Sequence, residues 1–474
     1  MSEQNEHAIA AEDRVPLKEK VAYGAGQVAG AFQGSLTEQL MQPIFVLSLG
    51  MPPAWIGILS AIYRIWDGIT DVLMGWISDN TRTRWGRRRP YIFLGAVLGG
   101  LWLPIVWLVN PEWSLTAMVA WLIFTQLVMF TFFTIWNIPY QSLMLEMTPD
   151  THERTNVAVA RQYLAAAVWG VMPWAWYVAE QPWFGATESR PSILQGALWV
   201  SVGAAVLTII FGSLPALFCR ERYYKTLKKD HRVSLWQNIK ATCENRPFRN
   251  LLLVSILFLL GMNAKIGLAL YLRVSYACQG DKQLAAKLSG YEGTITTIIA
   301  LLGIPLFQWL ARRYGKRRAM TWIMAVVFLS SISTWFSYRP DMPYLSIMSG
   351  ILLAPTSSAI WVLIPSMSGD IVDHDELETG ERREGAFAAV YSWVFKFAVS
   401  AGMALSGALV AWSGFDETIG AVQSAETIFW MRLLLATFPA ACVIGAMVIS
   451  TRYPLDTKAI LATRRSLELR RGKL

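Results

Sequence analysis

The sequence predicts an all-α membrane protein in which twelve transmembrane helices form two six-helix bundles. Its 474 residues are 54% hydrophobic and only 16% charged, whereas soluble proteins average about 25% charged residues. The apolar residues gather into twelve runs of about the 20 residues that a membrane-spanning helix needs. A basic motif also recurs at the equivalent place in each half. These observations exclude a soluble enzyme, a disordered chain and a secreted disulfide scaffold.

Charged residues, Pro and Gly bound the apolar runs and so define the spans. In chain order we expect them at 22–48, 54–78, 90–110, 114–143, 156–181, 193–219, 248–276, 288–311, 319–338, 342–366, 386–413 and 428–451. The basic stretch 220–247 is too polar to cross a membrane and is interpreted as a cytoplasmic linker. The predicted domains are therefore an N-terminal bundle (1–219), this linker, a C-terminal bundle (248–451) and a basic cytoplasmic tail (452–474).

The distribution of basic residues predicts the orientation. Of the 42 Lys and Arg, only Arg190, Lys282, Lys287 and Arg339 fall in the predicted outer loops, as expected when both termini are cytoplasmic. We therefore expect a multi-pass protein of the plasma (inner) membrane. The basic loops lack the interleaved aromatic residues of a nucleic-acid site. The expected partners are a small-molecule substrate and membrane lipid, with no nucleic acid, and the chain is expected to be a monomer.

The recurring motif follows the second and the eighth span. Gly75 and Asp79 precede a basic triplet that includes Arg87 and Arg88, and Tyr-Gly-Lys-Arg-Arg occupies 314–318. This supports two related bundles with the substrate near the midplane. The residues of the first motif are candidate gating residues, and the alternative is that both triplets serve only as topology anchors.

The acidic stretch from Asp370 to Glu384 is interpreted as a solvated gate or a loop linking two helices. Asp370 and Asp373 are its candidate gating residues. The stretch lacks the spacing of a calcium-binding loop. The four cysteines lie far apart with no CxxC spacing, so neither a metal site nor a disulfide framework is expected.

Two carboxylates inside the second span carry the main functional signal. Asp67 and Asp71 lie four residues apart, on one face of a helix. In a low dielectric both cannot stay charged unless a cation or a proton is shared. Lys396 lies at nearly the same depth in its own span and could neutralise the pair. The alternatives are structural ion pairs, formed by Asp67 and by Lys396, that only hold helices together.

Other ionisable residues inside the spans are also expected to have partners. Glu38 and Arg64 are predicted to form a buried pair, with Glu38 as a substrate ligand the alternative. Arg273 is expected to extend to the outer membrane interface. Lys265 lies deeper, and the sequence offers it no obvious partner.

Three motifs closely resemble those of the glycoside–pentoside–hexuronide:cation symporter family. They are the stretch from Ile65 to Ile77, the stretch from Arg82 to Pro90, and Asp370-Ile371-Val372-Asp373. The resemblance runs along essentially the whole chain and implies the major facilitator fold. It also implies a cation site of Asp67, Thr70, Asp71 and Thr134, with Lys396 as the coupling residue.

The family's sugar-contacting residues are only partly retained. The resemblance implies substrate contacts for Arg161 and Trp361, which could otherwise be a helix-end anchor and a packing residue. Two sugar-binding carboxylates of the family are replaced, one by Ala31 or Gly30 and the other by Asn137. Gln141 replaces an aromatic residue, and Lys265 is an additional candidate contact.

The predicted function is therefore symport of a sugar, glycoside or uronide, coupled to sodium or protons, by alternating access. Arg161 and Lys265 would suit an anionic sugar, whereas Asn137 and Gln141 would suit a neutral glycoside. The alternative is a transporter of lysolipids or other amphiphiles with the same fold. No HExxH, GxSxG or cofactor loop occurs, so neither an enzyme nor a cofactor is expected.

Overall fold

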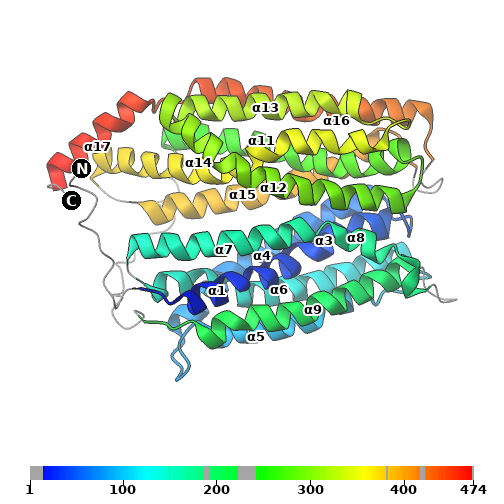
Figure 1. Cartoon of the computed structure of the whole chain (residues 1–474), viewed down its shortest axis with the longest axis horizontal. Coiled ribbons are helices and arrows are strands. Elements are labelled where there is room, and N and C mark those ends of the chain that lie inside the picture. The colour runs from blue at the N-terminus through cyan, green and yellow to red at the C-terminus, as the bar shows by residue number, and fades with distance from the viewer. Residues whose placement is uncertain are drawn as a thin grey trace. The chain divides into compact units, whose positions relative to one another are not determined.

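The structure, a computed structural model, describes residues 14–148, 150–185, 192–222, 242, 244–380, 383–416 and 422–471. Within these ranges the chain is almost entirely helical and contains no β-strand (Figure 1). The predicted all-α class is confirmed. Contacts divide the chain into two compact units, one made of 1–51 and 62–230 and the other of 52–61 and 231–474. The predicted linker falls mostly outside the described residues, and the predicted domain boundaries stay a prediction.

The helices of the first unit follow the predicted spans in order. They are α1 (Leu17–Ala25), α2 (Gln27–Ala31), η1 (Phe32–Leu36), α3 (Thr37–Met41), η2 (Gln42–Val46), α4 (Pro53–Asn80), α5 (Arg89–Trp102), η3 (Leu103–Trp107), α6 (Leu115–Met147), α7 (Thr151–Val171), α8 (Trp174–Ala179), η4 (Pro182–Phe184) and α9 (Ser192–Phe218). The first nine residues of α4, 53–61, cluster with the second unit.

Local sequence explains where these helices begin and bend. Ser114 and Asp150 cap α6 and α7 by accepting the backbone N–H of Ala117 and Glu153, as N-cap residues do. The first predicted span is a broken helix with two π-helical segments. Pro43, which has no N–H to donate, lies in the second of them.

The second unit is built from longer helices. They are α11 (Arg246–Leu272), η5 (Arg273–Ala277), α12 (Lys282–Tyr314), α13 (Lys316–Ser337), η6 (Pro343–Ile347), α14 (Met348–Thr379), α15 (Glu384–Trp412), α16 (Ala425–Thr451) and α17 (Thr457–Arg471). Asn245, Asp281 and Ser424 cap α11, α12 and α16. The predicted tail thus contains a helix, α17, which packs on α14.

The prediction of a loop at 370–384 is wrong for most of this stretch. Helix α14 continues to Thr379 and ends at Gly380, which adopts a left-handed conformation (φ 78°). Arg383 then pairs with Asp375, with nitrogen to oxygen distances of 2.6–2.9 Å. The acidic stretch is therefore the polar last part of a long helix, because a helix can continue beyond the apolar run that marks the membrane.

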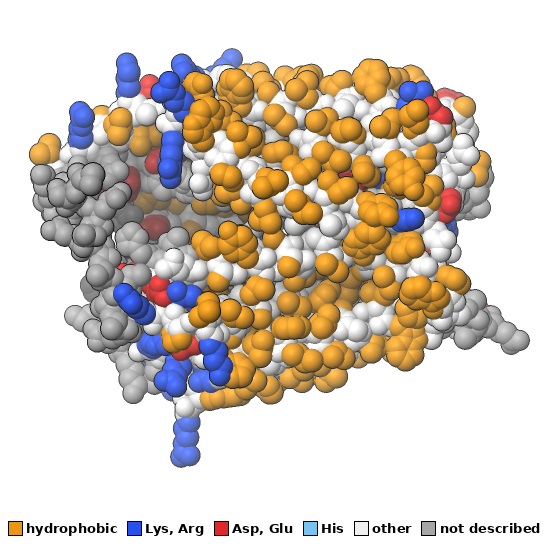
Figure 2. Space-filling model, in the orientation of Figure 1, with side chains coloured by type: hydrophobic (Ala, Val, Ile, Leu, Met, Phe, Trp, Pro, Cys, Tyr) orange, Lys and Arg blue, Asp and Glu red, His pale blue; other side chains and the backbone are white. Residues whose placement is uncertain are grey.

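Nine helical segments in the described part of the chain are long and apolar enough to cross a membrane. They are Arg89–Trp107, Leu115–Met144, Ser192–Phe218, Arg246–Ala277, Lys282–Tyr314, Lys316–Ser337, Pro343–Thr379, Glu384–Trp412 and Ala425–Thr451. Figure 2 shows hydrophobic side chains along the helices, with most Lys and Arg near helix ends. Helices also fill the other three predicted intervals, but the count of twelve spans stays a prediction.

An aromatic stack fixes the orientation of α6 in the first unit. The fully buried Trp136 stacks on Tyr140 with centroids 4.4 Å apart, and Tyr140 stacks on Tyr23 at 4.6 Å. A Cβ at Gly95 of α5 would lie 2.6 Å from the backbone nitrogen of Trp136, so this helix contact requires glycine. Residues two positions apart lie on opposite sides of a helix. The stack therefore turns Thr134 to the other side of α6.

The predicted pair of Glu38 and Arg64 is confirmed. An Arg64 Nη2 atom lies 2.9 Å and 3.1 Å from the two Glu38 carboxylate oxygens. The guanidinium also lies 5.6 Å from the ring centroid of Phe130. This pair neutralises both charges between α3 and α4 inside the first unit.

The expectation that Arg273 extends to the membrane interface is wrong. Its side chain is 5% exposed and pairs with Glu292 of α12, and it donates to the Ser289 hydroxyl at 2.8 Å. The nearby Glu292 carboxylate inside the bundle stabilises the guanidinium charge, so the side chain does not need to reach water at the membrane interface. Sequence reasoning had not singled out Glu292.

We predict that Glu292→Gln destabilises the protein by about 2–3 kcal/mol, because it leaves the buried Arg273 charge without its counter-charge. The midpoint of thermal unfolding of the purified protein in detergent should fall. The double variant Arg273→Met, Glu292→Met should recover most of the loss, since it removes both charges together. Equal destabilisation of the single and double variants would contradict this account.

Candidate functional site

The predicted cation-site residues come together between α4 and α6. Thr134 Oγ1 lies 3.3 Å from Asp67 Oδ1 and 3.2 Å from Asp71 Oδ1. Asp67 is only 3% exposed and Thr134 only 1%. Two carboxylates on successive turns of α4 are therefore bridged by one hydroxyl of the neighbouring helix.

Thr70 completes this oxygen cluster. Its hydroxyl lies 3.1 Å from that of Thr134, and it can donate to the backbone carbonyls of Trp66 (3.0 Å) and Asp67 (3.2 Å). With its own proton given to the backbone, Thr70 offers an oxygen lone pair to the cluster.

The cluster contains more hydrogen-bond acceptors than hydroxyl protons to donate to them. The single Thr134 proton faces three oxygens, those of Asp67, Asp71 and Thr70. A buried group of oxygens rich in negative charge is suited to a hard cation or to an additional proton. Among the described residues, no group of three or more His, Cys, Asp or Glu could hold a metal ion.

Lys396, the predicted coupling residue, lies in α15 of the second unit. Its side chain is partly buried, and its backbone carbonyl accepts a hydrogen bond of 2.9 Å from the Ser400 hydroxyl. Its role in coupling stays a prediction.

The predicted substrate residues of the first unit lie on α6 and α7. Gln141 Nε2 donates to Asn137 Oδ1 at 3.0 Å, so these two amides are adjacent on α6. Arg161 of α7 is partly exposed, and its guanidinium lies near the hydroxyl of Tyr23. The buried aromatic stack thus links the helices that carry Asn137, Gln141 and Arg161.

The two candidates of the second unit have contrasting environments. Trp361 of α14 is 61% exposed, with its ring 5.3 Å from that of Phe395. Lys265 of α11 is 5% exposed and donates to the hydroxyl oxygen (2.7 Å) and carbonyl oxygen (3.4 Å) of Ser330. Trp361 is accessible to a ligand, whereas Lys265 is occupied within its own bundle.

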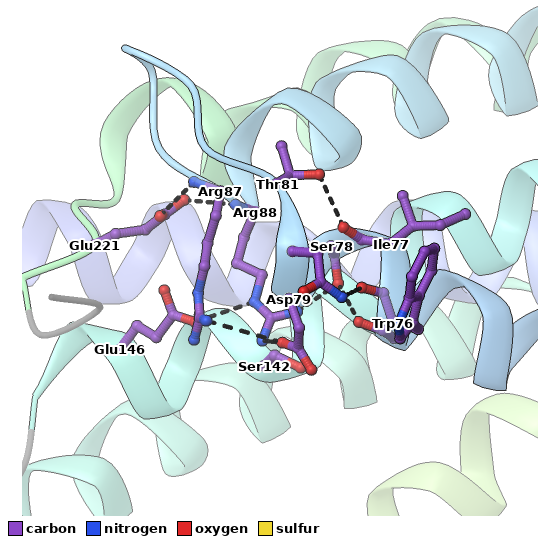
Figure 3. A network of polar contacts seen from close by, with 12 residues as sticks. Trp76, Ile77, Ser78, Asp79, Thr81, Arg87, Arg88, Ser142, Glu146 and Glu221 are labelled. Carbon is purple, nitrogen blue, oxygen red and sulfur yellow. Dashed lines mark hydrogen bonds and ion pairs between the residues drawn. The ribbon is translucent and has the colours of Figure 1, made fainter. Parts of the chain in front are cut away.

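The gating candidates Asp79, Arg87 and Arg88 form one polar network in the first unit (Figure 3). Arg88 Nη2 lies 2.5 Å from Asp79 Oδ1, and Arg87 and Arg88 both contact Glu146 Oε1, at 2.5 Å and 3.0 Å. Partial burial disfavours the charged Arg87 side chain, but hydrogen bonding to Glu146 and the charges of Glu146, Asp79 and Glu221 raise its pKa above the ordinary value.

Glu221, beyond the end of α9, anchors the backbone of the same loop. Its carboxylate accepts the N–H groups of Arg87, Arg88 and Arg89 at 2.7, 2.9 and 3.0 Å. Gly86 makes this possible, since its φ is +110° and a Cβ there would lie 2.4 Å from a Glu221 oxygen. Glu146 and Glu221 were not predicted as partners of these arginines. The sequence offered only one indication, that each is an acidic residue at the end of a predicted span.

The second unit repeats part of this arrangement. Lys316 pairs with Asp370 of α14 at 2.6 Å, as Arg87 and Arg88 pair with Glu146 of α6. Arg89 donates to the carbonyl of Ala216 near the end of α9, and Arg317 donates to the carbonyl of Thr451 at the end of α16. The recurring motif therefore makes equivalent contacts in the two halves.

The remaining gating candidates are Asp373 and Gly75. Asp373 lies on α14 one turn after Asp370. Around Gly75 there is open space, with the nearest atom to an added Cβ, Ile138 Cγ2, 4.0 Å away. The roles of all these residues in gating stay predictions.

Two helical units with buried ionisable residues along their helices define a multi-pass membrane transporter. The chain matches the family described as MFS/sugar transport protein over residues 22–457. It belongs to that family, which confirms the predicted fold and resemblance. Its members are transporters and not enzymes.

Individual similarities agree with this family. The isoprimeverose transporter of Lactiplantibacillus pentosus is 25% identical, covering 87% of this chain and 84% of that protein. The inner membrane symporter YicJ of Escherichia coli (strain K12) is 26% identical, covering 92% and 91%. The crystal structure of a bacterial homologue of the human lysosomal transporter Spinster shares the fold, with a TM-score of 0.64, 13% identity and coverage of 95% and 97%.

We predict that Gly86→Ala lowers thermal stability by about 1–3 kcal/mol, because alanine is strained at this φ and its Cβ displaces the Glu221 carboxylate. Gly75→Ala is the matched control, since it adds the same methyl group to a helix where space is open. The unfolding midpoint of Gly75→Ala should be equal to that of the wild type or slightly higher. Equal midpoints for both variants would show that Glu221 does not hold the loop as described.

Proposed function

We propose that this protein is a secondary symporter that couples the movement of a sugar or glycoside to that of sodium or a proton by alternating access. The observation that carries the proposal is the buried oxygen cluster of Asp67, Asp71, Thr70 and Thr134. A static pair would need only one carboxylate, whereas this cluster gathers two carboxylates and two hydroxyls. Relatives of similar length that are named as transporter and symporter support it.

In this proposal the cation neutralises the two carboxylates and draws α4 and α6 together. Thr70 and Thr134 contribute neutral oxygens, and Lys396 is the coupling residue. The charge state of Asp67 and Asp71 then changes during each transport cycle. The cost of leaving two carboxylates uncompensated in a low dielectric is what links cation occupancy to helix positions.

We assign substrate binding to Asn137, Gln141, Arg161 and Trp361. Amides and a guanidinium hydrogen-bond sugar hydroxyls, and an exposed indole offers a flat apolar face. We leave Lys265 out, because its ammonium already donates to Ser330 within its own bundle. Without it, the argument for an anionic sugar weakens and a neutral glycoside is favoured. This polar set also argues against an amphiphile.

We assign gating to two groups of residues at helix ends. The first comprises Gly75, Asp79, Arg87 and Arg88, and the second comprises Asp370 and Asp373. Ion pairs such as Arg88 with Asp79 can break and re-form as helices move, because Asp79 is 56% exposed and water can take the place of the arginine beside it. We further propose that the protein lies in a bacterial inner membrane with both termini in the cytoplasm, as the distribution of Lys and Arg indicates.

We predict that Asp71→Asn abolishes concentrative uptake, while exchange of substrate down its own gradient persists. Thr134→Val should weaken the apparent affinity for the coupling cation about tenfold, because it removes one oxygen from a charged site. The measurement is uptake of a panel of radiolabelled sugars into proteoliposomes, with and without a sodium or proton gradient.

Thr131→Val is the matched control for this prediction. Its hydroxyl lies on the same helix, accepts a 2.9 Å hydrogen bond from the Trp66 indole and donates to the Leu127 carbonyl at 2.8 Å. Neither of these partners is a carboxylate. Its cation dependence should match the wild type. Intact cation-dependent accumulation in both Asp71→Asn and Thr134→Val would refute the assigned site.

We predict that neutral glycosides compete for uptake and that glucuronate, galacturonate and a sulfonated sugar do not. Lys265→Gln should leave the inhibition constants of neutral glycosides unchanged, while Arg161→Gln should raise them about tenfold or more. Stronger competition by the anionic sugars, lost in Lys265→Gln, would instead establish an anionic substrate held by Lys265.

A further inference from the structure

A cavity of about 350 Å³ lies within the second unit, between α12, α13 and α14. Its walls are mostly apolar and include Ile304, Phe307, Ile323 and Leu363. Arg312 and Lys316 line it where α12 ends and α13 begins. The cavity is thus amphipathic, with a hydrocarbon-like interior and cations at one end.

The positive charge at this end of the second unit is in excess. Arg312, Arg313, Lys316, Arg317 and Arg318 follow one another within seven positions. Among the described residues, Lys316 alone of the five pairs with a carboxylate, that of Asp370. Arg312, Arg313 and Arg318 are exposed. Figure 2 shows Lys and Arg side chains gathered at the end of this unit that carries α17.

The equivalent loop of the first unit is different. There Arg87 and Arg88 share the carboxylates of Asp79 and Glu146, and Glu221 receives the loop backbone. The triplet at 87–89 thus lies against three carboxylates, whereas the triplet at 316–318 pairs with one, that of Asp370. Cytoplasmic loops of membrane proteins are generally rich in Lys and Arg. This rule applies equally to both loops, so it does not explain the difference between them.

The surroundings of the cavity are those of a membrane interface. Leu302, Leu306 and Trp309 of α12 are 69%, 52% and 56% exposed, and Tyr314 at the end of the helix is 45% exposed. Trp and Tyr at the end of an apolar helix surface occur at the level of lipid headgroups. A ligand that reaches the cavity from this surface would have to be apolar at one end and anionic at the other.

We propose that this cavity binds one anionic phospholipid. Its phosphate lies against Arg312, and one acyl chain lies along Ile304, Phe307 and Ile323. A basic pocket between transmembrane helices has the chemistry that recognises such headgroups. Lys316 contributes less than Arg312, because it already pairs with Asp370. On the proposed orientation the lipid belongs to the cytoplasmic leaflet.

The test is native mass spectrometry of the full-length purified protein, titrated with phosphatidylglycerol or with zwitterionic phosphatidylcholine. We expect one phosphatidylglycerol to bind more tightly than phosphatidylcholine. Arg312→Gln should weaken it about fivefold, the contribution of one basic residue near a lipid surface. Ala311→Trp, which fills the cavity and keeps every charge, should weaken it as well.

Arg318→Gln is the matched control, because Arg318 is equally exposed but does not line the cavity. It should retain the wild-type affinity. Inorganic phosphate at millimolar concentration should not displace the lipid, which separates a lipid site from a phosphate site. Equal affinities for the two lipids, equal effects of Arg312→Gln and Arg318→Gln, or full binding by both Arg312→Gln and a folded Ala311→Trp would each overturn the proposal.

Discussion

A charged side chain inside the membrane must find its counter-charge within the protein, since lipid cannot solvate it. Each unit meets this requirement with a pair between neighbouring helices, Arg64 with Glu38 and Arg273 with Glu292. Lys265 has neutral partners, the hydroxyl and carbonyl oxygens of Ser330, which accept hydrogen bonds from its ammonium group. The cluster around Thr134 is different in kind, because it brings two carboxylates to one hydroxyl. It is the site to which we assign the coupling cation.

Helix α6 places this cluster because its two sides have separate tasks. One side carries Trp136 and Tyr140 into the aromatic core, where close contacts leave little freedom of rotation. The other side carries Thr134 to the carboxylates of α4. Rigid packing behind a polar site holds its oxygens at fixed positions, and such preorganisation favours binding of a small ion over nonspecific hydration. The packing of the core and the chemistry of the site thus depend on the same helix.

The sequence predicted the class of fold and the approximate places of the helices, because both follow from local apolar patterns. It failed at polar helix ends such as Asp370 to Thr379, where an apolar run stops before the helix does. The pairing of Asp67 with Asp71 followed from helical spacing, and Thr134 from resemblance. Glu146, Glu221 and Glu292 were missed, because partners distant in sequence or hidden in an apolar run leave no periodic signal. Tertiary contacts alone identify them.

The network around Glu146 and Glu221 also has a consequence for biosynthesis. Glu146 lies 59 positions after Arg87, and Glu221 lies 134 positions after it. At translation rates of roughly 5–20 residues per second, Glu221 emerges from the ribosome about 7–27 seconds after the arginines. The loop is therefore strongly cationic while the insertion machinery reads its charge, and Glu146 and Glu221 reach its arginines only when the bundle closes. One group of arginines thus directs orientation in the nascent chain and serves as a tertiary anchor in the finished protein.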